Sequence, residues 1–234
     1  MTAGPHFGIS VLTTAYLPPV EYFFAIAHSD SVRIEQHEAY QKQSWRSRCR
    51  ILAAGGPEDL SIPVIKEERR SRPIRDVRID YSEPWLQHHI RAFAAAYHSS
   101  AFYDYYADDL LPILERRSVF LFDLNMALLE KLLDLLDIHV PVALTERYAK
   151  SVEDLAQPKM VLTAQRPVGV VFDGRQRIQP KYKGESLLAE YGCQQAYYQV
   201  FVNQMPGQAG FIPNLSILDL LSAEGPDAGR FLRT

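Results

Sequence analysis

Short apolar runs and a helical pattern alternate at the start of the chain. Residues 8–13 form an apolar run with β-branched side chains, residues 20–28 carry apolar side chains at helical spacing, and residues 31–36 resemble the first run. Prolines 18 and 19 fix φ in between and favour a rigid turn. This strand–loop–helix–strand opening predicts an α/β fold with a mixed or parallel sheet.

Alternation with a period of two then predicts a strand over residues 44–52. Arg46, Arg48 and Arg50 fall on one face of that strand. The other face carries the larger apolar side chains, those of Trp45, Cys49 and Ile51. We therefore expect Cys49 to be a buried structural cysteine and not a reactive thiolate.

The remaining pattern predicts a helical middle of the molecule. Gly55-Gly56-Pro57 breaks the chain after the basic strand. The further elements expected are strands at 59–65, 74–79 and 197–202 and helices at 84–98, 102–114, 118–136 and 214–223. We expect one domain over residues 1–234, with a helical segment at about 84–136 and an irregular segment at about 137–196.

Charge is distributed unevenly along the chain. The net charge of −3 gives no reason to expect a nucleic-acid partner. Residues 41–78, however, hold ten Lys or Arg against five Asp or Glu, a local net charge of +5, so the other residues carry −8. Such asymmetry can concentrate an anionic ligand at the basic segment.

Several classes of protein are disfavoured. No apolar run approaches the ~20 residues that span a bilayer, so we expect no stable membrane insertion. Residues 1–8 lack the features of a signal peptide, and two sparse cysteines fit a reducing compartment, so we expect a cytoplasmic protein. No metal-ligand spacing or cofactor-binding motif is present, and we predict neither metal nor cofactor. The oligomeric state stays open.

The arginines are the first candidates for substrate binding. Guanidinium groups recognise phosphate or carboxylate by paired hydrogen bonds, so Arg46, Arg48 and Arg50, with the preceding Lys42, would hold a small anionic substrate. The alternative is a solvated edge strand whose arginines pair with the protein's own acids. Tyr16 is expected to line the pocket mouth.

The candidates for proton transfer are two histidines. His37 follows the second strand, where open α/β sheets bind ligands, and Glu35 shares its face and would orient the imidazole or act as base. His89 lies four residues after Trp85, which favours a packed, hydrogen-bonded histidine, with a general acid/base role as the alternative. Tyr22 is expected to lie with Tyr16 at the pocket mouth.

Five segments together resemble the WbqC-like protein family over nearly the whole chain. They are residues 14–23, 35–51 and 60–64, the set Trp85, His89 and Tyr97, and residues 210–221 with 224–226. This family takes its name from genes in O-antigen and other surface-polysaccharide clusters. Our first hypothesis is an enzyme, transferase-like, that acts on a nucleotide-activated sugar or an acyl donor in surface-glycan assembly. The alternative is a non-catalytic binding or scaffolding protein.

A second resemblance concerns the opening alone. Residues 13–22 with the following helix and strand are similar in layout to HIGH-motif nucleotidyltransferases. Glu21 and Tyr22 stand where that family has its second Gly-His, so the triphosphate-binding histidines are missing. Only the strand–loop–helix layout is carried over.

Overall fold

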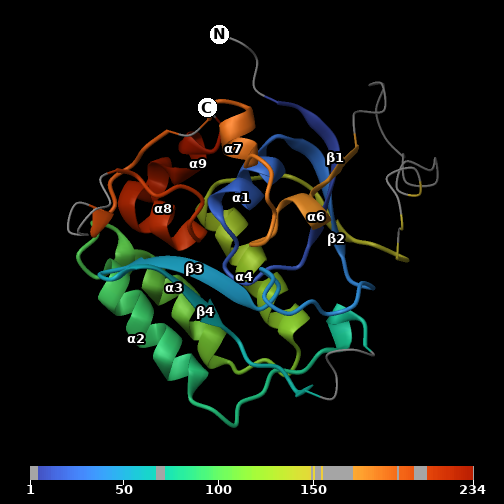
Figure 1. The fold of residues 1–234 in the computed structure, drawn as a ribbon, viewed down its shortest axis with the longest axis horizontal. Coiled ribbons are helices and arrows are strands. Elements are labelled where there is room, and N and C mark those ends of the chain that lie inside the picture. Colours follow the sequence, from blue (N-terminus) through green and yellow to red (C-terminus); the bar gives the residue numbers. More distant parts are fainter. Residues whose placement is uncertain are drawn as a thin grey trace.

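A computed structural model of the chain has a parallel sheet with helices packed around it (Figure 1). The residues it describes are 5–66, 72–148, 150, 154, 171–193, 195–202 and 210–233. The four strands of the sheet, in spatial order, are β5 (Val142–Leu144), β2 (Ser29–Glu35), β1 (Phe7–Thr13) and β6 (Val171–Asp173). All three pairings are parallel, which confirms the predicted α/β fold.

The opening of the chain folds as its pattern predicts. Helix α1 (Val20–Ala27) connects β1 to β2, and β1 is buried along nearly its whole length. Continuous burial of this kind is typical of parallel strands that are covered on both faces.

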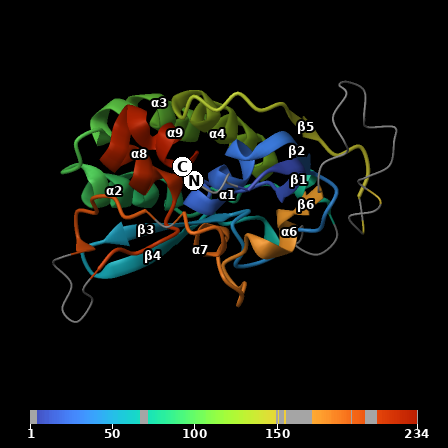
Figure 2. The ribbon, with the colours of Figure 1, turned by 90° about the horizontal axis from the view of Figure 1, so that it is seen from above.

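The described residues also form a hairpin and further helices. The hairpin pairs β3 (Arg48–Ala53) with β4 (Gly56–Ser61) in antiparallel register. The helices are α2 (Trp85–Tyr97), α3 (Tyr103–Glu115), α4 (Leu121–Leu135), α6 (Gly174–Arg177), α7 (Leu187–Glu190), α8 (Ile217–Glu224) and α9 (Ala228–Phe231), with 3-10 turns η2 (Ile74–Asp76) and η5 (Gly225–Asp227). In Figure 2, α3 and α4 lie on one side of the molecule, and the hairpin, α6 and α7 lie on the other.

The predicted basic strand is wrong at its first residues. The strand begins at Arg48, and residues 42–46 form turns. Long-range contacts hold this turn, since Trp45 accepts a hydrogen bond from the Tyr16 backbone and Asn125 donates to the Arg46 carbonyl. Arg46 therefore does not share a strand face with Arg48 and Arg50, although Trp45, Cys49 and Ile51 are buried as expected.

Three further expectations need correction. Residues 74–79 contain the 3-10 turn η2 and isolated bridges instead of a strand. Residues 197–202 form no strand, because the side chain of Gln199 bonds both backbone groups of Ile212 and replaces a ladder. Short elements, β5, β6, α6 and α7, lie within the segment expected to be irregular, of which residues 155–170 lie outside the described residues.

Candidate functional site

The order of the strands indicates where a ligand would bind. From β1 the chain moves outward to β2 and then β5 on one side, whereas β6 pairs with the other side of β1. The strand order therefore reverses between β1 and β6. In open α/β sheets ligands bind at the carboxyl ends of the strands at such a switch point.

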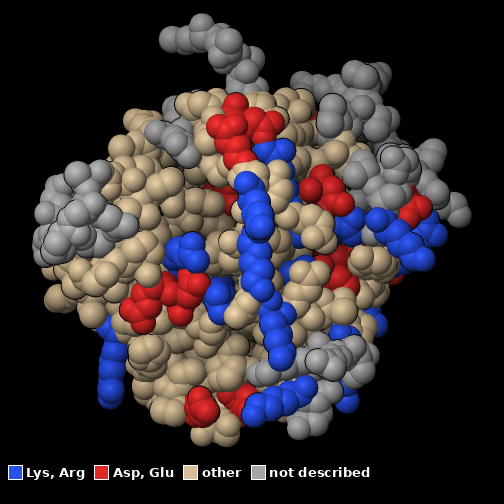
Figure 3. Space-filling view, viewed as in Figure 1, with Lys and Arg blue, Asp and Glu red and all other residues tan. Residues whose placement is uncertain are grey.

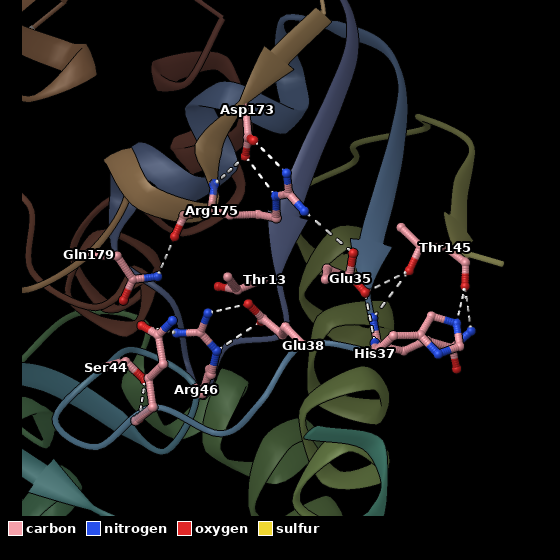
Figure 4. A network of polar contacts seen from close by, with 12 residues as sticks. Thr13, Glu35, His37, Glu38, Ser44, Arg46, Thr145, Asp173, Arg175 and Gln179 are labelled. Atoms are coloured by element: carbon pink, nitrogen blue, oxygen red, sulfur yellow. Dashed lines mark hydrogen bonds and ion pairs between the residues drawn. The ribbon is translucent and has the colours of Figure 1, made fainter. Parts of the chain in front are cut away.

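Charged and polar side chains gather at this edge of the sheet (Figure 4). We call them the sheet-edge network: Thr13, Glu35, His37, Glu38, Arg46, Thr145, Asp173 and Arg175. Glu35, at the end of β2, is fully buried and accepts hydrogen bonds from the Thr145 hydroxyl at 3.0 Å and from the His37 backbone N–H at 2.7 Å. Arg175 Nη1 lies 3.5 Å from its other oxygen. The Glu35 carboxylate is thus held from several sides.

The sequence did not single out Arg175, Asp173 and Thr145 of this network. Asp173, the last residue of β6, caps α6 by accepting the Arg175 backbone N–H at 3.1 Å. It also accepts from Arg175 Nε at 2.9 Å and Nη2 at 2.6 Å, and these bonds raise the pKa of the guanidinium. The only local signal was an Asp-Gly-Arg sequence after an apolar run.

Arg46 forms a second buried ion pair. Its Nε and Nη2 donate to the two oxygens of Glu38 at 2.8 and 2.5 Å, and neither side chain has more than a trace of exposed surface. Burial raises the pKa of Glu38, and the bonds from Arg46 lower it in part. The predicted anion-binding guanidinium is therefore already paired with a carboxylate of the protein.

His37 lies at the same edge with one ring nitrogen engaged. Its Nε2 is 3.0 Å from the Thr145 carbonyl oxygen. A carbonyl only accepts, so the neutral ring carries its proton on Nε2 and leaves the Nδ1 lone pair, which has no hydrogen-bond partner among the described residues. The expected contact of Glu35 with the imidazole is wrong, because Glu35 accepts the backbone N–H of His37 instead.

A second group of predicted residues lines a cavity of about 510 Å³ between the hairpin and α2, which we call the hairpin cavity. Lys42, Arg48 and His89 come together there. Trp85 lines it as well and is only 6% exposed, yet its indole N–H has no hydrogen-bond partner in the described part of the chain. A buried donor without a partner is costly and rare in folded proteins.

His89 is a packed histidine, as its spacing from Trp85 predicts. Its Nδ1 is 2.9 Å from the Tyr16 hydroxyl, and its ring packs edge to face with Trp85. Burial, and then the neighbouring His88, lower its pKa to about 4, so it is neutral at pH 7. A group with this pKa and a bonded Nδ1 is a poor general base.

The placement of two tyrosines at a pocket mouth is wrong. Tyr16 is fully buried, and its hydroxyl faces His89. Tyr22 is also buried and donates to the Thr13 carbonyl at 2.7 Å. Burial raises the pKa of both hydroxyls.

Arg48 and Arg50 share one carboxylate. Arg48 Nη1 lies 3.0 Å from Asp59 Oδ2, and Arg50 Nε lies 2.7 Å from Asp59 Oδ1. Arg50 does not line the hairpin cavity. Cys49 between them is buried, and burial raises the pKa of its thiol, so it is a structural cysteine as expected.

A third feature adjoins the sheet-edge network. This lysine cavity, about 250 Å³, is lined by Lys42, Lys181 and Lys183 together with neutral side chains. Gln179 on its wall donates to the Arg175 carbonyl at 2.8 Å, and Gln41 accepts from Arg46 Nη1 at 3.5 Å, so the lysine cavity borders the sheet-edge network. Figure 3 shows Lys and Arg side chains in a column down the middle of this face.

The described residues show neither a cluster of metal ligands nor a membrane-spanning helix. Within the described residues, no three His, Cys, Asp or Glu side chains lie together as metal ligands would. No helix in the described part of the chain has both the length and the apolar character needed to cross a bilayer.

Comparison with known proteins identifies relatives of the chain. The sequence profile of the WbqC-like protein family matches residues 14–231. A protein of Mycobacterium tuberculosis (strain ATCC 25618 / H37Rv), named "Uncharacterized protein Rv1507c", is 29% identical over 231 residues, which cover 96% of this chain and 98% of the relative. No solved structure matches.

Proposed function

Because this chain belongs to the WbqC-like protein family, we propose that it is a cytoplasmic enzyme of bacterial surface-polysaccharide biosynthesis. Its substrate is an anionic small molecule, a nucleotide-activated sugar or an acyl donor, and its reaction is a group transfer. The observation that carries this proposal is the sheet-edge network at the strand switch point, with the lysine cavity beside it and the hairpin cavity next to the lysine cavity. The hairpin cavity has the volume usual for small-molecule sites, about 300–1,000 Å³.

Among the candidate bases we favour His37, which lines neither cavity and would therefore act on an acceptor held at the sheet edge and not on the donor. Its Nε2 is fixed by Thr145, so Nδ1 is oriented and has a lone pair to accept a proton. In the transfer, an acceptor hydroxyl or amine forms the new bond to the donor carbon and gives its proton to Nδ1. The phosphate or thiolate leaves with the electron pair of the broken bond. Glu35 supports this role only indirectly, through the His37 backbone.

A non-catalytic binding protein is the second candidate. The pairing of Arg48 and Arg50 with Asp59 favours it, because a substrate would have to compete with that carboxylate. On this alternative the protein holds an anionic ligand or an acidic partner and converts nothing.

A ligand screen followed by a conversion assay separates the candidates. The protein is screened by thermal shift against nucleotide sugars, nucleotides, acyl-coenzyme A compounds and sugar phosphates. A ligand at 100 times its dissociation constant adds about 2.7 kcal/mol, or roughly 5–10 °C for a chain of this size. The stabilising ligand is then incubated with the protein and candidate acceptors and followed by ³¹P NMR and mass spectrometry. Conversion supports the enzyme, binding without conversion supports the second candidate, and no binding at millimolar ligand contradicts the enzyme and leaves an acidic partner as the occupant.

A further inference from the structure

The two cavities share a wall. Lys42 and Gln43 line both the hairpin cavity and the lysine cavity, so one ligand can reach from one cavity to the other across this turn. Gln43 adopts a positive φ of 55°, which is unusual for a residue other than glycine. The shared wall is thus a tight turn of the chain, with a cavity on each side of it.

The lysine cavity has the chemistry of an anion site. Its three ammonium groups carry one sign of charge, and no Asp or Glu lines it. In the described part of the chain none of the three forms an ion pair or a hydrogen bond through its side chain. Arg46, Arg48 and Arg50, in contrast, are each paired with a carboxylate. An incoming phosphate would therefore meet less competition at the lysines than at any of these arginines.

The hairpin cavity has a different chemistry. Besides basic groups it presents hydroxyls, carboxylates and aromatic rings: Tyr40, Ser47, Asp59, Ser61, Glu83 and Trp85. Hydroxyls, carboxylates and basic groups together can donate to and accept from a neutral group that carries many hydroxyls. The carboxylates would repel a phosphate, so this cavity is less suited to the charged half of a ligand.

We infer that the ligand is a phosphorylated sugar that lies across the Lys42–Gln43 turn, with its phosphate in the lysine cavity and its sugar in the hairpin cavity. This inference rests on the proposed function and narrows its substrate from any anionic donor to one class. An acyl-coenzyme A compound lacks the second, hydroxyl-rich half that the hairpin cavity would select.

The test measures binding of separate halves of the ligand by isothermal titration calorimetry. The probes are inorganic pyrophosphate, acetyl-coenzyme A and four phosphorylated sugars: glucose 1-phosphate, UDP-glucose, UDP-N-acetylglucosamine and GDP-mannose. We expect at least one phosphorylated sugar to bind more tightly than pyrophosphate. In K181A/K183A, the affinity for both kinds of probe should fall about tenfold or more, the usual cost of losing hydrogen bonds to a charged group.

A variant of the hairpin cavity should separate the two kinds of probe. Glu83→Ala removes an exposed acceptor of this cavity. It should weaken the phosphorylated sugar severalfold and leave pyrophosphate unchanged. Lys131→Ala is the control, because Lys131 pairs with Asp109 between α4 and α3, on the side of the molecule opposite α6 (Figure 2). This control should bind every probe as the parent protein does.

Two results would overturn the inference. One is pyrophosphate or sugar binding that K181A/K183A leaves unchanged, and the other is tighter binding of acetyl-coenzyme A than of all four sugars. If a ligand of the wider screen is bound and converted while either result holds, the inference fails and the proposed function stands. If no ligand of that screen binds, both fail.

Discussion

Arg46 and Arg48 are two positions apart, but the guanidinium group of Arg46 is buried and that of Arg48 is partly exposed to solvent. The Arg46 side chain is 0% exposed and pairs with Glu38, whereas that of Arg48 is 22% exposed and shares Asp59 with Arg50. Arg46→Met leaves a buried, unpaired carboxylate, and we expect it to lower the free energy of unfolding by about 3–5 kcal/mol. Arg48→Met should cost less than about 1 kcal/mol. Urea unfolding measures both, and equal costs would contradict the assignment of Arg46 to a structural ion pair.

His37 allows a second prediction for a single residue. His37→Gln keeps a donor for the Thr145 carbonyl but removes the basic Nδ1. If His37 is the general base, conversion of the substrate should slow by about 10²–10⁴-fold while the dissociation constant stays the same. His139→Gln is the matched control, because it makes the same substitution at an exposed histidine that pairs with the exposed Asp137. Unchanged turnover in His37→Gln would remove His37 from the mechanism.

At the scale of secondary-structure elements, the spacing of apolar residues predicted the helices and strands whose conformation depends mainly on neighbouring residues in the sequence. β1, α1, β2 and the middle helices follow from apolar spacing alone. The turn before β3 does not, since alternation continues through it while contacts from Glu38 and Asn125 set its path. β6 is three residues long and pairs with a strand far earlier in the chain, so the apolar run before Gly174 did not identify it as a strand. The candidate site was therefore only half predictable: Glu35, His37 and Arg46 lie in the patterned region, and Arg175 does not.

The packing of α9 against the end of α4 gives a prediction for an element. A Cβ at Gly229 would lie 2.0 Å from the Leu136 carbonyl oxygen, so the backbone of α9 must move to admit it. Gly229→Ala should lower the free energy of unfolding by about 1–3 kcal/mol. Gly55→Ala is the control, because a Cβ in that hairpin turn meets nothing within 4 Å. Thermal melts compare the two variants, and equal melting temperatures would show that α9 is not packed as described.

For the whole molecule, two buried groups make stability depend on pH in opposite directions. Burial lowers the pKa of His89 from 6.5 to about 4, so the stability associated with His89 is lost as pH falls through this range. Burial raises the pKa of Asp219 from 3.8 to about 6, so the stability associated with Asp219 is greatest at low pH and is lost as pH rises through about 6. Between about pH 4 and 6 the two effects offset each other, and above pH 6.5 only the cost of charging Asp219 remains.

Asp219→Asn should therefore stabilise the fold at neutral pH. Tyr197 and Gln199 both donate to Asp219 Oδ2, at 2.8 and 2.9 Å, and an amide oxygen can accept the same two bonds without a buried charge. The rise of the Asp219 pKa from 3.8 to about 6 corresponds to a destabilisation of roughly 3 kcal/mol when the carboxyl is charged. The variant also loses a carboxylate near the start of α8, where a negative charge stabilises the helix by up to about 1 kcal/mol. We expect the variant to gain about 2 kcal/mol at pH 7.5 and nothing at pH 4, where the parent carboxyl is already protonated. Denaturant unfolding at both pH values measures this, with the exposed Asp108→Asn as control. A gain of the same size at both pH values would mean that it comes from packing and not from the charge of Asp219.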